Sequence, residues 1–178
     1  MVRRVVTGHR DGKAVFLADG VPPRTVVAQK MPGSEVSFAW ATPVQPRIAA
    51  RGEADAVSGE TSFLPQPGET RLSFLKIPPE SVVTRDDFDA AAAVEEFVRQ
   101  QPEIAATMDP EHPGRHRTDT IDYVIVLEGE IHLELDGQQE VLLKRHDVVV
   151  QNGTWHTWHN RSAEVVSLAV VLVGARRE

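Results

Sequence analysis

The 178-residue sequence contains no cysteine, which excludes disulfide bonds and thiolate metal ligands. Any metal ion would have to be held by histidine, aspartate or glutamate side chains. A chain without cysteine suits a reducing compartment, and we therefore expect a cytoplasmic protein.

Positive charge and long apolar runs are also scarce. The chain has 19 Lys and Arg against 26 Asp and Glu, a formal net charge of −7. Because nucleic-acid affinity rests on clustered Lys and Arg, we predict no nucleic-acid partner. The longest apolar run, residues 168–173, is far too short to span a bilayer, and the N-terminal residues lack the apolar stretch of a signal peptide, so we expect no membrane association.

Short β-branched and aromatic runs, bounded by Gly, Pro, Asp or Asn, dominate what is present, and such runs are typical of strands. They lie at residues 2–7, 14–18, 25–28, 36–41, 72–77, 121–127, 131–135, 141–143, 148–150 and 165–173. The pattern predicts an all-β sandwich or barrel. Between two of the runs, Asp136 and Gly137 predict a type I′ hairpin turn.

One segment has helical periodicity instead. Its apolar residues at helical spacing are Phe88, Ala91, Val94 and Val98. We expect one amphipathic helix over residues 86–101, with Pro102 ending it or beginning another short turn. The helix would pack on the outer wall of the barrel or cover its mouth. Residues 43–70, rich in Pro, Gly, Ser and charge, predict a loop.

Two polar clusters occupy the C-terminal half. In the first, His116, Thr118 and Asp122 precede Gly129 at a spacing that resembles the first motif of the cupin superfamily, His-x-His, three or four residues, Glu, six residues, Gly. Asp122 stands in the Glu position and Thr118 in that of the second His.

The second cluster also resembles a cupin motif, which ends Pro-x-Gly-x-x-His-x-x-x-Asn. Gly153, His156 and Asn160 fall at its spacing, with Gln151 in place of the proline. The resemblance implies a cupin-type (RmlC-like) jelly-roll β-barrel over residues 71–178, preceded by an N-terminal strand extension and loop over residues 1–70.

The resemblance also implies a ligand set of His116, Asp122 and His156 for Zn²⁺, Fe²⁺, Mn²⁺ or Ni²⁺, with Thr118 as a weak or water-mediated contact. A straight strand would separate His116 from Asp122 by roughly 20 Å. The chain must therefore bend between residues 117 and 121 if the ligands are to meet.

Other roles for these residues remain open. A metal-free enzyme would use Asp122 as a base oriented by His116, with the pKa of Asp122 raised by burial. Trp158 shares parity with His156 and is expected either to contact a flat ligand or to belong to the core. Tyr123 should face away from Asp122.

Two function classes follow. The first is a metal-dependent small-molecule enzyme, for which the resemblance allows dioxygenase, isomerase, decarboxylase and lyase chemistries. Asp122 and His116 would be its catalytic residues, and Trp158 and Thr118 its substrate contacts. The second is a non-catalytic module that binds a small or sugar-like ligand. We also predict a homodimer, because unpaired strands at residues 2–7 and 36–41 would pair across subunits.

Overall fold

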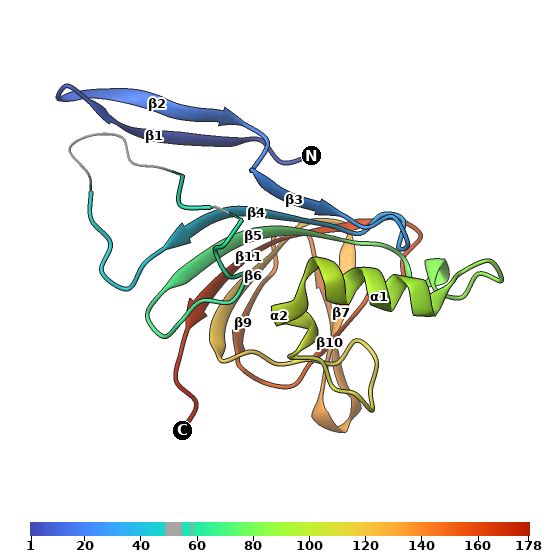
Figure 1. Cartoon of the computed structure of the whole chain (residues 1–178). Helices are drawn as coiled ribbons and strands as arrows, with labels where there is room; N and C mark the ends of the chain where they lie inside the picture. Colours follow the sequence, from blue (N-terminus) through green and yellow to red (C-terminus); the bar gives the residue numbers. More distant parts are fainter. Residues whose placement is uncertain (49–54, 58) are drawn as a thin grey trace.

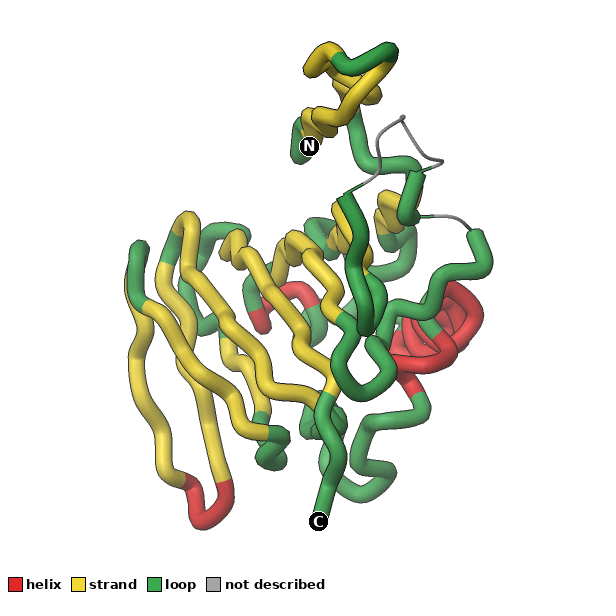
Figure 2. Tube along the Cα trace, turned by 90° about the vertical axis from the view of Figure 1, so that its left-hand side faces the viewer, coloured by secondary structure: helices red, strands yellow, loops and turns green. Residues whose placement is uncertain are grey.

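The computed structural model describes residues 1–48, 55–57 and 59–178. Two antiparallel sheets form the walls of a barrel, and a separate two-stranded hairpin stands off from it (Figures 1 and 2). The predicted all-β jelly-roll barrel is therefore confirmed. Within the described ranges, no helix is both long and apolar enough to cross a membrane.

The larger sheet has six strands. Their spatial order is β3 (Arg24–Val27), β4 (Glu35–Thr42), β5 (Thr70–Ile77), β11 (Val166–Gly174), β6 (Thr120–Glu128) and β9 (Val148–Asn152). The smaller sheet orders its strands β10 (Thr157–His159), β7 (Glu130–Leu135) and β8 (Gln139–Lys144). Strands distant in sequence, β5, β11 and β6, thus lie side by side.

The main core lies between the two sheets. Its buried members alternate along the strands, as inward-facing residues of half-buried strands do. They are Val124 and Val126 of β6, Ile131 and Leu133 of β7, Leu143 of β8, and Val166, Leu168 and Val170 of β11. A second cluster, Phe38, Ala41, Val57 and Phe63, fills the space beside β4.

Two strand details differ from the sequence prediction. The strand β10 is not predicted, since its three residues are too few to show alternation. The hairpin between β7 and β8 forms, but the predicted two-residue turn is wrong. Leu135 pairs with Gln139, which leaves a three-residue loop, the 3₁₀ turn Asp136–Gln138. Gly137 and Gln138 both have positive φ.

The predicted helix is present but shorter. Helix α1 (Ala90–Gln100) begins after Asp89, whose side chain accepts a hydrogen bond from the Ala92 amide. Pro102 begins a second short helix, α2 (Pro102–Ala105), which confirms the expectation that it could begin another short turn. A 3₁₀ turn, η1 (Glu80–Val82), precedes them.

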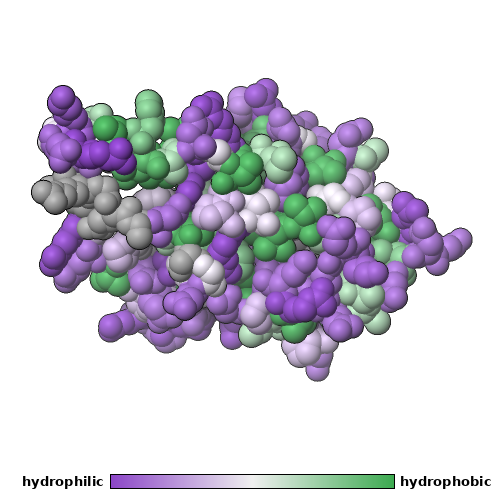
Figure 3. All heavy atoms as spheres, turned by 45° about the horizontal axis from the view of Figure 1, so that its top comes forward, coloured by the Kyte–Doolittle hydropathy of each residue, from purple (hydrophilic) through white to green (hydrophobic). Residues whose placement is uncertain are grey.

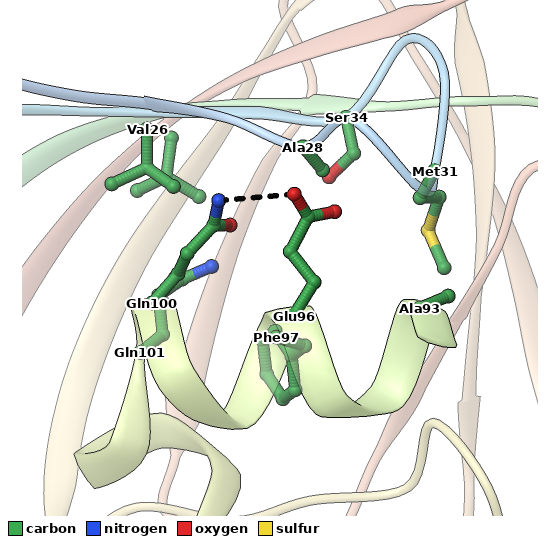
Figure 4. Close-up of a pocket in the computed structure, with 10 residues that line it drawn as sticks. Val26, Ala28, Met31, Ser34, Ala93, Glu96, Phe97, Gln100 and Gln101 are labelled. Atoms are coloured by element: carbon green, nitrogen blue, oxygen red, sulfur yellow. Dashed lines mark hydrogen bonds between the residues drawn. The ribbon is translucent and has the colours of Figure 1, made fainter. Parts of the chain in front are cut away.

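The inward face of α1 is not the one that the periodicity predicts. Val94 and Val98 are exposed, whereas Ala93 and Glu96 are buried. The Glu96 carboxylate accepts the backbone amides of Gln29 (3.1 Å) and Lys30 (2.7 Å) in the loop after β3. These hydrogen bonds fix the helix rotation, and α1 packs beside β3 and β4 over a cavity of about 60 Å³ (Figure 4).

The N-terminal hairpin comprises β1 (Arg4–Arg10) and β2 (Lys13–Gly20), which form a sheet of their own. Arg4 ties it to the body of the protein through an ion pair with Asp55 and a hydrogen bond to the Ala39 carbonyl. Strand β4 has hydrogen-bonded neighbours on both sides, β3 and β5. The expectation that residues 36–41 offer a free edge to a second subunit is therefore wrong.

Candidate functional site

Strand β6 carries alternate residues to opposite faces of the large sheet. Thr120 and Asp122 are buried on the side of the core residues Val124 and Val126, whereas Tyr123 is exposed on the outer side. Asp122 therefore faces the barrel interior, and Tyr123 faces away, as the alternation predicts.

The chain bends at Asp119, immediately before β6, within the predicted range. Before the bend, two backbone hydrogen bonds join His116 to His156. The His116 amide donates to the His156 carbonyl at 3.0 Å, and the His156 amide donates to the His116 carbonyl at 3.1 Å. The two imidazole rings lie with centroids 4.2 Å apart. Two histidines that are 40 positions apart thus become direct neighbours.

The C-terminal segment holds both halves of this arrangement. The Arg177 guanidinium donates to the carboxylate of Asp119 (2.7 Å) and to the carbonyls of Thr118 and Gly153 (both 3.1 Å). Gly153 has a φ of +56°, and a Cβ there would meet the Thr118 carbonyl at 3.0 Å. A glycine is therefore required where the two segments approach.

The hydrogen bonds of the two imidazoles assign their tautomers. Nδ1 of His116 contacts the Gly114 carbonyl at 3.1 Å, and Nδ1 of His156 contacts the Thr154 carbonyl at 3.0 Å. Because a carbonyl only accepts, each Nδ1 must carry the proton. Burial lowers the pKa of both histidines, that of His156 to about 4 with a contribution from His116, so both rings are neutral near pH 7. Each Nε2 is left as a hydrogen-bond acceptor.

Asp122 is a carboxyl group without full hydrogen bonding. Its side chain is buried, and its Oδ1 has no hydrogen-bond partner among the described residues. Burial raises the pKa of Asp122 from an ordinary 3.8 to about 6, against a weaker opposing effect of Thr120. The group can therefore exist as acid or base close to neutral pH.

Two threonines and a glutamine complete the polar part of the interior. The hydroxyls of Thr118 and Thr120 share a hydrogen bond of 2.5 Å, and both residues are buried. Gln151, also buried, pairs with Asp122 in the register of β6 and β9 and donates to the hydroxyl of Thr154. Thr118 is thus hydrogen-bonded within the protein.

The tryptophans lie on different sides of the site. Trp158 packs against the main core and meets His156 edge-on, with ring centroids 5.8 Å apart. It therefore belongs to the core wall beside the imidazole pair. Trp155 is stacked instead with the guanidinium groups of Arg115 (4.9 Å) and Arg117 (4.6 Å).

The structure brings His116 and His156 together and places Asp122 inside the barrel, but it does not assemble the expected metal ligand set. Across the described ranges, no three His, Asp or Glu side chains are grouped so that they could hold a metal ion. Two neighbouring imidazoles are fewer protein ligands than the three of a catalytic zinc site. The residues as placed therefore do not fit a three-ligand metal centre.

Sequence reasoning assigned no role to Gln151 or Arg177, and it gave Thr120 a role only in the turn before β6. For Gln151 a signal existed, because it replaces the motif proline and lies on the strand that pairs with Asp122. Nothing in the sequence linked Arg177 to Thr118 and Gly153, since these contacts span 59 and 24 positions.

The chain is similar to a known domain family and to several individual proteins. A family model of the cupin domain matches residues 105–173. Phomopsin biosynthesis cluster protein D of Diaporthe leptostromiformis is 33% identical over 160 residues, covering 89% of this chain and 70% of that protein. The cupin-domain-containing oxidoreductase virC of Hypocrea virens is 44% identical over 45 residues, covering 25% of this chain but only 23% of its own length.

A solved structure is also similar. It is an RmlC-like cupin family protein with a double-stranded β-helix fold from Methanocaldococcus jannaschii, with 12% identity, coverage of 69% of this chain and 91% of that chain, and a TM-score of 0.41. The motif residues, the barrel, the matched cupin domain and the likeness to the phomopsin cluster protein together show that this chain belongs to the cupin superfamily.

Proposed function

We propose that the chain is a small-molecule enzyme that binds a hydroxyl-bearing carbonyl compound in the barrel and transfers a proton through Asp122. The observation that carries this proposal is the buried carboxyl of Asp122, which faces the interior with one oxygen unpartnered among the described residues. A buried polar atom without a partner costs free energy, and a bound ligand that supplies a donor would recover it.

The imidazoles of His116 and His156, which neighbour each other, support a ligand that carries hydroxyl groups. With Nδ1–H of His116 and His156 bound to backbone carbonyls, each Nε2 can only accept a hydrogen bond. A ligand that meets them must bring donors, and hydroxyl groups are the simplest. Trp158, edge-on to His156, offers an apolar surface to the remainder of such a ligand.

The proposed step balances without a further reactant. The Asp122 carboxylate removes a proton from the carbon next to the ligand carbonyl, and the electron pair of that C–H bond forms a C=C bond as the carbonyl becomes an enolate. The protonated Asp122 then returns the proton to the same carbon or, where the ligand has a C=C bond conjugated with the enolate, to the far end of that system as the double bond shifts. The net reaction is proton exchange in the first case and isomerisation by a double-bond shift in the second, and a carboxyl with a pKa of about 6 can act in both directions.

The names of similar proteins support an enzyme of small-molecule metabolism. Three relatives are named for biosynthesis clusters and two as cupin-domain oxidoreductases. The choice of proton transfer rests on the residues of this chain, since fold and family permit several chemistries.

The proposal is tested with a dihydroxyacetophenone and its dimethyl ether, which keeps the ring and the carbonyl but has methyl groups in place of the two hydroxyl protons. Binding is followed by tryptophan fluorescence, and deuterium uptake at the carbon next to the carbonyl is followed by NMR in heavy water. We expect the dihydroxy compound to bind at least tenfold more tightly than the ether and to exchange faster than in buffer alone. Asp122→Asn should abolish the exchange and retain the binding.

The matched control is His132→Ala, because His132 alternates with the buried Ile131 and Leu133 and so lies on the other face of β7. This variant should exchange like the wild type. Equal exchange by the wild type and Asp122→Asn would overturn the proposed role of Asp122.

A non-catalytic binding module is the second candidate. The observation that favours it is the hydrogen bonding of Thr118 with Thr120 and of Gln151 with Thr154, which occupies these side chains within the protein. Tight binding of the dihydroxy compound by the wild type, with exchange no faster than in buffer, would identify this function.

Metal dependence stays a prediction of the family resemblance. Elemental analysis of the protein purified without a histidine tag tests it independently of any substrate. Stoichiometric Zn, Fe, Mn or Ni that is lost in a folded His156→Ala variant would establish a metal centre, which the arrangement of Asp122, His116 and His156 described above does not predict.

A further inference from the structure

We propose that the cavity between α1 and the β3–β4 loop binds a small organic ammonium compound, whose charged head meets the Glu96 carboxylate. The cavity measures about 60 Å³. Its ten lining residues come from β3, β4, the loop between these strands, α1 and the residue that follows α1. Of the described residues that line it, none belongs to the candidate site, so it is a separate site on the molecule.

Glu96 is the only ionisable residue among the described residues that line the cavity, and it is just 5% exposed. Its Oε1 accepts hydrogen bonds from the Gln29 amide and the Gln100 side chain, and its Oε2 accepts one from the Lys30 amide. These donors are neutral, and Glu96 forms no ion pair within the described ranges. The side chains of Lys30 and Arg99 act on it only at longer range. A buried carboxylate without a cation in contact favours the binding of one.

Two polar side chains of the cavity lack a hydrogen-bond partner within the described ranges, namely Gln101 and Ser34. Hydrophilic side chains on the face shown in Figure 3 lie at the surface, where they meet water. Gln101, by contrast, is only 9% exposed. Figure 4 shows Gln101 at the end of α1 and Ser34 across the cavity on the β3–β4 loop. Because buried polar groups are normally paired, these side chains indicate a polar ligand.

The free acceptors of the cavity match the three N–H donors of a primary ammonium group. A carboxylate has about four lone-pair positions, and the three donors use three of them at Glu96. The fourth position, the Gln101 carbonyl oxygen and the Ser34 hydroxyl oxygen provide three acceptors. An anionic ligand would instead meet Glu96 with a like charge. The formal net charge of −7 also favours a cation.

The rest of the cavity wall sets the size and character of the ligand. It is apolar, and its residues are Val26, Ala28, Met31, Val36, Ala93 and Phe97. Benzene occupies an engineered cavity of about 150 Å³, which is about 25 Å³ for each carbon atom. On that scale, a cavity of about 60 Å³ takes about two or three non-hydrogen atoms. Methylammonium and ethylammonium have this size, with a short alkyl group for the apolar wall.

A titration of ¹⁵N-labelled protein with ethylammonium chloride tests the proposal. The amide resonances of Gln29, Lys30 and Ala93 report on the cavity, ethanol is the neutral probe of equal size, and sodium chloride is the salt control. Because so small a ligand gains little free energy, we expect a dissociation constant of about 1 to 10 mM. Ethanol should bind at least tenfold more weakly.

Two variants remove the groups that would hold the ammonium. Glu96→Gln keeps an acceptor for the backbone amides but removes the charge, so it should weaken ethylammonium binding at least tenfold. Gln101→Leu should weaken it at least threefold. The matched control is Glu95→Gln, which makes the same charge change at an exposed position of α1 and should bind like the wild type.

Circular dichroism checks the folding of each variant. If Glu96→Gln does not fold, Ala93→Met replaces it, because it fills the cavity from a buried position on α1 and should abolish the shifts. Three results would overturn the proposal: equal shifts with sodium chloride, ethanol binding as tight as that of ethylammonium, or binding that is undiminished in Gln101→Leu and in Glu96→Gln or its replacement.

Discussion

Asp122 and Tyr123 are neighbours in the chain, yet one is enclosed in the barrel and the other lies on its outer surface. This alternation gives the two faces of β6 different surroundings. Its inner residues place a carboxyl beside core aliphatic groups, which raises the pKa of that carboxyl, whereas Tyr123 on the outer side is exposed.

Asp122→Asn should make stability less dependent on pH. The folded state holds the Asp122 proton up to about pH 6, whereas the unfolded chain releases it near its ordinary pKa of 3.8. Ionising this buried group therefore costs stability progressively as the pH rises through that window, and the cost is complete above it. A shift of about two pKa units corresponds to about 3 kcal/mol.

The measurement is urea unfolding of both proteins at several pH values. The variant should be more stable than the wild type by up to about 3 kcal/mol above pH 6, and similar to it near pH 4. A variant that is less stable than the wild type at pH 7 would show that Asp122 is favourably ionised in the folded protein.

At the scale of single residues, the sequence predicts which residues are neighbours more accurately than it predicts the role of each residue. Motif spacing brought His116 and His156 together correctly, and alternation placed Tyr123 outside. The spacing could not show that Nδ1–H of each histidine binds a carbonyl, nor that Thr118 bonds to Thr120. Those contacts depend on backbone geometry that no motif encodes.

Among the elements, α1 shows how one polar residue overrides an apolar pattern. Glu96 satisfies two backbone amides of the β3–β4 loop, and Gln100 donates to the same carboxylate at 3.3 Å. These bonds hold the pKa of Glu96 below its usual value, the amide of Lys30 making the largest contribution. The stabilisation that the Glu96 carboxylate provides is complete above the ordinary pKa of a glutamate, and it is lost as the pH falls through the lowered pKa of Glu96.

Glu96→Ala should loosen α1 and the loop after β3. Without the carboxylate, the amides of Gln29 and Lys30 lose their acceptor, so their hydrogen exchange should accelerate at least tenfold and the Tm should fall by several degrees. Glu95→Ala, on the exposed side of the helix, is the control. Equal exchange in the two variants would mean that Glu96 does not anchor the helix.

Arg177 is the second element-scale contact with a defined consequence. Arg177→Ala removes its bonds to Asp119, Thr118 and Gly153, and with them a link between the two segments that carry the histidines. Because the arginine is partly exposed, we expect only about 1 kcal/mol of destabilisation. The imidazole resonances of His116 and His156 should nevertheless shift in NMR spectra.

The exposed neighbour Arg176 provides the matched control, since Arg176→Ala should leave those resonances unchanged. Imidazole resonances that stay in place in Arg177→Ala would show that the C-terminal segment does not position the site.

Most strands are predictable because β-branched runs with Gly, Pro, Asp or Asn boundaries are strong local signals. Strand β10 is not, because Thr157–His159 is too short to show alternation and is defined by its pairing with β7. The rotation of α1 and the hairpin loop at Gly137 also depend on distant or cross-strand hydrogen bonds rather than on local pattern.

The whole molecule combines a barrel, whose small sheet and large sheet enclose the candidate site, with a hairpin whose two strands pair with no further strand of the described residues. The sequence prediction of a dimer relied on free edges at residues 2–7 and 36–41. The second is occupied, because β4 lies between β3 and β5, and the homodimer stays a prediction. A cytoplasmic location stays a prediction.

A dimer should make thermal stability depend on concentration. Association stabilises the folded state by mass action, so raising the wild type from about 1 to 100 μM should raise its Tm by several degrees. A Tm that does not change over this range of concentration would contradict the predicted homodimer.

The most direct test of the central claim is a pH titration of the Asp122 carboxyl carbon by ¹³C NMR, with Asp122→Asn used to assign its resonance. A carboxyl enclosed in the barrel as described should titrate with a pKa of about 6. A pKa at or below the ordinary 3.8 would show a solvated or ion-paired carboxylate and would contradict its role as an acid–base group.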